Sequence, residues 1–513
     1  MKIAFHRSSM QLLAIAAFSC CVSSGLVRQV HADVKLPNVF SDHMVLQQGQ
    51  ENRIWGTATA GESVSISIAD KSIETKADAK GYWETKLPSM KASSNPIKLT
   101  IKGSSVVEIN DILVGEVWIC SGQSNMQWTV ASSNDADLEK LTSNFPNIRM
   151  INFPQIGTQD PIWSHDDRKW MVSGPSTVSG FSAVGYFFAR QIHQTTGTPI
   201  GMINNAWGGS AAEAWVNRDL MKSDVRFAGL LKRWTGLEER FAALSAKTDR
   251  NEAESKELNG LEGQMRGNAR PGNIYNGVLK SHIGYGIKGA IWYQGESNAG
   301  RAYQYRDLFP FMIDNWRKEW GQGDFPFYWV QLADFQPERT EPGDSDWAEL
   351  REAQTMTMDK LANSGQAVII DIGEGKDIHP KNKVDVARRL ARWALAKQYD
   401  QAIEFQSPRY ESMEKIEGGI ALKFASVGKG WRPFDVNEPR GFSIAGEDKK
   451  FYNADAKILP DGRIEVKSAS VSAPVSVRYA WAQNPICNMF SQNGLPLTPF
   501  RTDDWTGITA GKD

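Results

Sequence analysis

The sequence lacks an excess of either sign of charge. Its 513 residues include 58 Lys and Arg and 59 Asp and Glu, which leaves a formal net charge of −1 at pH 7. Proteins that bind nucleic acid or anionic membranes electrostatically carry a basic excess or basic clusters. The charge balance gives no sign of such a partner, and we expect neither nucleic acid nor a membrane surface.

Cysteine and histidine are also scarce. Four Cys and seven His occur, and no Cys-x-x-Cys pair or Asp and His cluster has the spacing of metal ligands. We therefore expect no metal and no other cofactor. Cys20 and Cys21 lie near the N-terminus, so Cys120 and Cys487 are the thiols that remain. The sequence leaves open whether these two form a disulfide or stay free.

Long apolar runs are missing as well, and a membrane-spanning helix needs about 20 such residues. The apolar run 12–22 is too short, and it follows the basic residues Lys2 and Arg7. Together with the small-residue cleavage pattern that ends at Ala32, this predicts a signal peptide over 1–32.

The mature chain is then expected to begin at Asp33 and to be exported, either to a periplasm or to the medium. A buried N-terminal helix and a lipoprotein anchored through Cys20 are the alternatives. No later segment is long and apolar enough to span a membrane.

The length and the hydrophobic pattern predict several domains. Residues 33–110 alternate in hydrophobicity between turn residues, which is typical of a β-sandwich module. Strand-like and helix-like stretches alternate over 111–400, which favours an α/β domain with a parallel sheet flanked by helices. A charged, helix-rich stretch at about 218–265 is interpreted as an insertion in that domain, and 401–513 reads as a second β domain.

The α/β domain carries its own set of expected elements. The expected strands are 112–119, 147–153, 200–205, 289–293, 327–332 and 367–372, and the expected helices are 183–195, 303–320 and 384–398.

Four of the expected strands end in residues that suit catalysis, and sites in parallel sheets form at the carboxyl ends of strands. Ser124 follows the first strand in Gly-Gln-Ser-Asn-Met. A Ser on a sharp strand-to-helix turn presents both its hydroxyl and a backbone N–H, as a nucleophile with one oxyanion donor requires. The alternative is an ordinary helix N-cap. The motif is not the Gly-x-Ser-x-Gly elbow, because Met126 occupies the position of the second Gly.

The other three strand ends are weaker signals when taken singly. Paired glycines in Trp207-Gly208-Gly209 allow close backbone approach to a ligand. Gln294 offers an amide that donates without titrating. His379, in Asp-Ile-His-Pro, is the one His that lies between an expected sheet strand and a new helix. Each of these also has a purely structural interpretation, as a loop residue.

Taken together, the four motifs resemble the SGNH-hydrolase superfamily, and most closely the sialate O-acetylesterase family. The resemblance implies a flavodoxin-like sheet with accessory β-sandwich domains. It also implies that Ser124 is the nucleophile and His379 the general base. The implied oxyanion hole consists of the backbone N–H groups of Ser124 and Gly209 with the side chain of Gln294. Gln294 stands where many members of the superfamily have Asn.

One position departs from the superfamily pattern. Many members place the Asp of the triad three residues before the His, where this sequence has Lys376, and Asp377 follows it. Asp377 is our candidate for orienting the imidazole. The alternatives are a Ser–His dyad oriented by a backbone carbonyl, or help from one of three other carboxylates, Asp371, Glu374 and Glu296.

The resemblance implies a serine esterase that removes acetyl groups from carbohydrate, with O-acetylated sialic acid as the expected substrate. Acetylxylan or another plant polysaccharide is the alternative substrate. A non-catalytic carbohydrate-binding protein is the alternative of another class. The 18 Trp fit either sugar stacking or core packing, so they do not decide between these.

The expected signal peptide can be tested by the N-terminus of the exported protein. Mass spectrometry of protein recovered outside the cytoplasm should find Asp33 first, and Ala32→Arg should block processing because the cleavage site needs a small residue. Full-length protein that keeps residues 1–32 after export, or that stays in the cytoplasm, would contradict the expectation.

Overall fold

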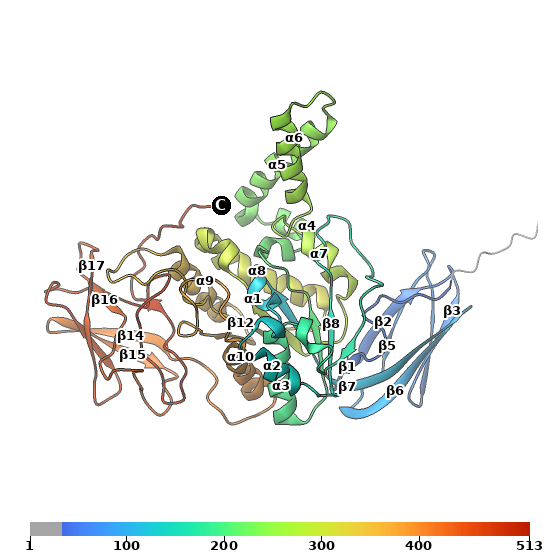
Figure 1. The fold of residues 1–513 in the computed structure, drawn as a ribbon, viewed down its shortest axis with the longest axis horizontal. Coiled ribbons are helices and arrows are strands. Elements are labelled where there is room, and N and C mark those ends of the chain that lie inside the picture. Colours follow the sequence, from blue (N-terminus) through green and yellow to red (C-terminus); the bar gives the residue numbers. More distant parts are fainter. Residues whose placement is uncertain (1–32) are drawn as a thin grey trace, which may run out of the picture.

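The computed structural model describes residues 33–513, so the expected signal peptide and its cleavage site lie outside the described residues. β strands occupy both ends of the long axis, and a helix-covered sheet lies between them (Figure 1). Within 33–513, no helix combines the length and apolarity that crossing a membrane requires.

The middle region is built on a parallel sheet centred on β7 (Val106–Gly122). Its strands stand in the order β8-β10-β7-β11-β12-β13, all parallel, and β9 adds an antiparallel edge. Without β8 and β9 this is the flavodoxin-like order 2-1-3-4-5, which confirms the expected fold class. The bounds are β8 Ile148–Asn152, β9 Met171–Val172, β10 Ile200–Asn204, β11 Gly289–Tyr293, β12 Phe327–Val330 and β13 Ser364–Ala367.

Helices cover both faces of this sheet, and alternate side chains of β7 pack against the helices on opposite faces. Trp118 and Cys120 pack in the core beneath α3 (Ala183–Thr196) and α10 (Lys383–Gln398). Val117 and Ile119 belong to the opposite core, beneath helices α8 and α9. Alternating side chains along one strand therefore serve two layers, as expected for a sheet buried on both faces. The bounds of the second pair are α8 Ala302–Trp320 and α9 Asp346–Lys360.

The N-terminal β strands are joined to the middle region through β7 itself. The first half of β7 pairs with β6, and its second half pairs with β10 and β11. The boundary expected after residue 110 falls inside this strand, at Asp111, which has a left-handed φ of 54° and pairs with Arg149 at 2.6 Å. The N-terminal strands are β1 Val45–Gln47, β2 Asn52–Thr57, β3 Ser63–Ile68, β4 Lys71–Lys76, β5 Tyr82–Leu87 and β6 Ser93–Lys102.

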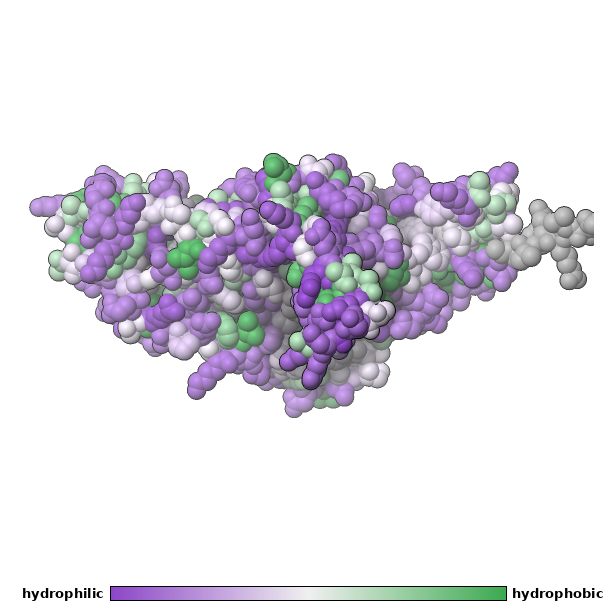
Figure 2. Space-filling view, turned by 90° about the horizontal axis from the view of Figure 1, so that it is seen from above, coloured by the Kyte–Doolittle hydropathy of each residue, from purple (hydrophilic) through white to green (hydrophobic). Residues whose placement is uncertain are grey.

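Two antiparallel helices project from the middle region (Figure 1). They are α5 (Ala228–Ala246) and α6 (Glu252–Met265), which follow the short helix α4 (Arg218–Lys222). Seen from the side toward which they project, the surface is mainly hydrophilic, with scattered apolar residues (Figure 2). The remaining α-helices are α1 Ser124–Gln127, α2 Ala136–Leu141 and α7 Asn273–Gly277.

The C-terminal region consists of two four-stranded antiparallel sheets, in the orders β14-β15-β19-β18 and β17-β16-β20-β21. Their shared core also takes in Val368 and Ile370, which lie just beyond β13. The strands are β14 Arg409–Ile416, β15 Gly419–Ala425, β16 Phe442–Ala445, β17 Phe451–Asn453, β18 Asp455–Ile458, β19 Ile464–Lys467, β20 Ser476–Tyr479 and β21 Phe500–Arg501.

The last strand of the parallel sheet was wrongly placed by the sequence pattern. The apolar run predicted a strand over 367–372, whereas β13 is Ser364–Ala367. The residues after β13 are apolar because they are buried outside the sheet: Val368 and Ile370 pack on the C-terminal β strands. Both remaining cysteines are free thiols: Cys120 is buried in β7, and Cys487 lies in the C-terminal region.

Gly122 closes β7 in a conformation that only glycine adopts readily, with φ of 136°. A Cβ there would lie 2.2 Å from the carbonyl oxygen of Tyr293 on the neighbouring strand. Gly122→Ala should therefore lower the melting temperature, with a cost of more than about 1 kcal/mol. Gly174→Ala is the control, because an added Cβ meets nothing within 4 Å there. Equal melting temperatures for the two variants would contradict this account.

Candidate active site

Ser124 lies at the topological switch point of the parallel sheet, where the chain passes from β10 on one side of β7 to β11 on the other. It follows the carboxyl end of β7, between β10 and β11, and it is the first residue of α1. The first N–H groups of a helix have no partner within the helix, so the N–H of Ser124 is available to a ligand. The side chain of Gln123 braces the turn, because its Oε1 accepts from the N–H groups of Gly295 and Ser297 at 3.1 and 3.4 Å.

The structure brings the His379 imidazole to the Ser124 hydroxyl. Nε2 lies 2.8 Å from Oγ, although the two residues are 255 positions apart in the chain. The ring stacks on the indole of Trp128, with centroids 4.9 Å apart and planes 12° from parallel. The imidazole is thus held by a polar contact at one nitrogen and an aromatic face beside it.

Asp377 is the carboxylate that the structure places beside the other imidazole nitrogen. Its Oδ1 lies 3.4 Å from Nδ1 of His379, and the same oxygen accepts the backbone N–H of His379 at 2.9 Å. The other carboxylates that the sequence left open have different partners. Asp371 pairs with Arg389, Glu374 with Lys381, and Glu296 with Asn125.

Of the two glycines after β10, Gly208 approaches Ser124 closely. A Cβ on Gly208 would lie 3.4 Å from the Cβ of Ser124. The N–H of Gly208 already donates to Oε1 of Gln127 at 2.7 Å. Gly209 has a left-handed φ of 72°, and among residues 33–513 its N–H has no hydrogen-bond partner. Of the two, Gly209 is therefore the one with an N–H to offer a ligand.

The structure does not place the Gln294 amide as an oxyanion donor. The side chain is fully buried. Its two N–H groups are both used, on the Ser210 carbonyl at 3.1 Å and on Oδ1 of Asn298 at 2.7 Å, and its Oε1 accepts from Tyr305. Gln294 instead holds the turn after β10 through its bond to the Ser210 carbonyl. The sequence showed an amide at a strand end, but it could not show which way that amide points.

Two residues that sequence reasoning missed lie beside the pair. Asn125, next to Ser124, donates to Oε1 of Glu296 at 2.8 Å and to the Ile378 carbonyl at 3.0 Å. Its Oδ1 accepts from Nζ of Lys383, which is fully buried. No sequence signal marks Lys383, because a Lys in the first turn of an amphipathic helix normally lies in solvent.

The pKa of His379 is lowered from its ordinary value of 6.5, chiefly because partial burial disfavours the charged ring. Asp377 acts in the opposite direction and raises the pKa, while Lys383 lowers it. The imidazole is therefore largely neutral near pH 7, as a general base must be. Burial also raises the pKa of Glu296 and lowers that of Lys383 to about 7.

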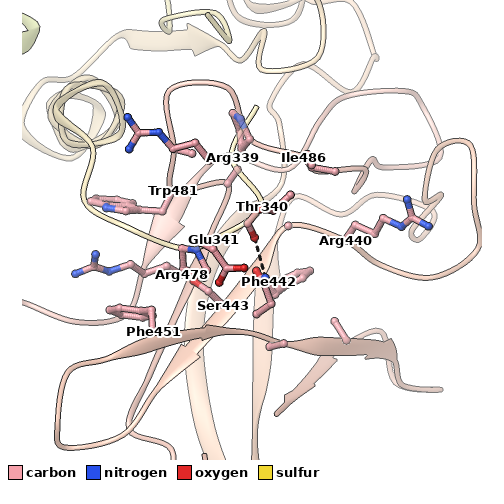
Figure 3. A pocket seen from close by; sticks show the side chains of 18 of the residues that line it. Arg339, Thr340, Glu341, Arg440, Phe442, Ser443, Phe451, Arg478, Trp481 and Ile486 are labelled. Carbon is pink, nitrogen blue, oxygen red and sulfur yellow. Dashed lines mark hydrogen bonds between the residues drawn. The ribbon is translucent and has the colours of Figure 1, made fainter. Parts of the chain in front are cut away.

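A separate cavity of about 690 Å³ lies between the loop 339–343, which precedes α9, and the C-terminal β strands (Figure 3). On one side of it Arg478 lies between two aromatic rings, 4.1 Å from the centroid of Phe451 and 5.1 Å from that of Trp481. Arg478 also pairs with Asp503 at 2.9 Å. Neither Ser124 nor His379 lines this cavity, so it is distinct from the Ser–His site.

No group of three or more His, Cys, Asp or Glu within residues 33–513 is arranged to hold a metal ion. The chemistry that these residues themselves offer is that of a serine hydroxyl beside a neutral imidazole, with backbone donors close by. On a flavodoxin-like sheet, this defines the class of protein as a hydrolase of the SGNH type.

Comparison with known proteins gives the family. Residues 114–244 and 266–396, more than half of the chain, match the family described as carbohydrate esterase, sialic acid-specific acetylesterase. The chain is similar to the sialate O-acetylesterase of Mus musculus, at 26% identity over 91% of this chain and 94% of the mouse protein. The human enzyme of the same name is 24% identical over 91% of this chain and 92% of its own length.

A solved structure agrees with these relatives. It is described as a novel carbohydrate acetylesterase from Xanthomonas citri and is 35% identical, with a TM-score of 0.79 over 92% of this chain and 100% of that chain. This chain therefore belongs to the carbohydrate esterase family of sialic acid-specific acetylesterases, and it is a carboxylic ester hydrolase.

The electrostatics of the site predict the titration of His379. NMR titration of the assigned imidazole should give a pKa below 6.5, and Asp377→Asn should lower it further, because the substitution removes the group that raises it. Lys376→Gln is the control, since Lys376 precedes Asp377 but is no cause of the shift. An upward shift in Asp377→Asn would contradict the assignment of Asp377 as the charge partner.

Proposed function

We propose that this chain hydrolyses O-acetyl esters on carbohydrate, with Ser124 as nucleophile and His379 as general base. The observation that carries the proposal is the 2.8 Å separation of Oγ and Nε2 at the carboxyl edge of the sheet. A nucleophile and its base must lie within about 2.6–3.2 Å for proton transfer. The same contact argues against the non-catalytic alternative, which has no need of it.

The proposed reaction has two halves. Ser124 Oγ attacks the acetyl carbonyl while Nε2 of His379 accepts its proton, and an acetyl ester forms on Ser124. The sugar oxygen leaves with the proton that His379 held. Water then attacks the acetyl-enzyme, again losing a proton to His379, and acetate is released as Ser124 regains its hydrogen. Asp377 favours the tautomer with the proton on Nδ1, which leaves Nε2 free to accept.

For the oxyanion we propose the backbone N–H groups of Ser124 and Gly209. Support comes from the position of Ser124 at a helix start and from Gly209, whose N–H has no hydrogen-bond partner among residues 33–513. The neighbouring Gly208 lies against Ser124. Removal of a single oxyanion donor typically costs about 10²- to 10³-fold in turnover. No metal or organic cofactor takes part in the proposed steps.

The proposed substrate is O-acetylated sialic acid, and the proposed place of action is outside the cytoplasm. The names of the mammalian relatives and of the matching family support the sugar. The basic and apolar pattern of residues 1–32 supports export. Acetylated xylan is the competing substrate.

A panel of acetylated glycans tests the proposal. The wild-type protein should release acetate from O-acetylated sialic acid faster than from acetylated xylan, and a chelator should leave both rates unchanged. Ser124→Ala should abolish release, because no other group supplies the nucleophile, whereas Ser94→Ala, at an exposed serine of β6, should keep it. Residual activity of Ser124→Ala near the wild-type rate would exclude the mechanism. Faster release from xylan would exclude the sugar.

A further inference from the structure

Lys383 is a buried lysine in a place that is unfavourable to its charged form. It is the first residue of α10, its side chain has 0% exposure, and Nζ lies 2.5 Å from Oδ1 of Asn125. Burial penalises an ammonium group, and the N-terminus of a helix is the positive end of its dipole. Because burial of this amine is costly, we expect Lys383 to have a role in the site.

The hydrogen bonds of the Asn125 side chain show what Lys383 does there. An ammonium group can only donate, so Oδ1 of Asn125 must face Lys383. The amide nitrogen is then forced to the other side, where its two N–H groups donate to Glu296 at 2.8 Å and to the Ile378 carbonyl at 3.0 Å. With a flipped amide, these two acceptors would face an oxygen and lose both hydrogen bonds.

The bonds of Asn125 tie three turns together. Asn125 itself follows Ser124, Glu296 begins the segment after β11, and Ile378 immediately precedes His379. We propose that Lys383 is a positioning residue which fixes the orientation of the Asn125 amide and so holds the Ser124 turn against the His379 loop. This inference rests on the proposed function of Ser124 and His379.

The charge of Lys383 acts on the same pair. Its ammonium disfavours a second positive charge on the nearby imidazole and lowers the pKa of His379. The pKa of Lys383 is about 7, so the side chain is cationic over the acidic range in which His379 titrates.

The ring of Tyr293 lies 5.2 Å from Nζ and that of Trp128 5.8 Å, within reach of a cation–π interaction. The titratable groups around Nζ are Tyr293 from β11, Glu296 from the segment after it, and Glu374, Asp377 and His379 from the loop before α10.

The test is the pH profile of kcat and KM for Lys383→Met and Lys383→Gln. Met matches the length of Lys without a donor or a charge, and Gln keeps an N–H donor without the charge. In Lys383→Met, kcat should fall about 10-fold or more with KM within about twofold, because misplacement of reacting groups slows chemistry rather than binding. In both variants the acidic limb of kcat/KM should move to higher pH, by about half a unit or more, because a positive charge near His379 is gone.

Leu390→Ala is the matched control, since Leu390 is equally buried on α10 but belongs to the apolar core beneath the sheet. It should lower the melting temperature and leave the acidic limb in place. A wild-type kcat in folded Lys383→Met would overturn the proposal, and so would an unmoved limb in either folded variant. Failure of both variants to fold would also overturn it, because the role of Lys383 would then be purely structural. Inactive wild-type protein would instead refute the proposed function.

Discussion

The contact between the Ser124 hydroxyl and the His379 imidazole is the interaction on which the account of this protein depends. The two side chains lie 2.8 Å apart across 255 positions of chain, so no local preference can hold them together. The parallel sheet does so. β7 ends at the Ser124 turn, the chain leaves the last strand, β13, shortly before the His379 loop, and the flavodoxin-like order brings these carboxyl ends to one edge.

The surroundings of this contact are unusually polar for a buried place. The buried amides of Gln123, Asn125 and Gln294 connect segments that follow different strands of the sheet, and each makes hydrogen bonds within the site. Buried polar groups are costly unless they are hydrogen-bonded, and bonds of this kind hold the turns in a defined geometry. A pair of reacting groups needs such a fixed geometry, since small displacements slow proton transfer and attack.

Much of the fold and part of the site could be predicted from the sequence. The alternation of strands and helices over 111–400 predicted the parallel sheet, and the motifs at its strand ends predicted that Ser124 and His379 would meet. The orientation of side chains could not be predicted. Gln294 was expected to point at an oxyanion and instead faces Ser210 and Asn298. Lys383 looks like a surface cation in the sequence, because the pattern of its own helix does not show its contact with Asn125, which is 258 positions away.

The most direct test of the central claim is covalent labelling with a fluorophosphonate, which reacts only with a serine activated by a neighbouring base. Mass spectrometry of the wild-type protein should find the label on Ser124, and His379→Ala should remove nearly all of it while the protein stays folded. Labelling of another serine, or undiminished labelling of Ser124 in His379→Ala, would show that the 2.8 Å contact is not the basis of catalysis.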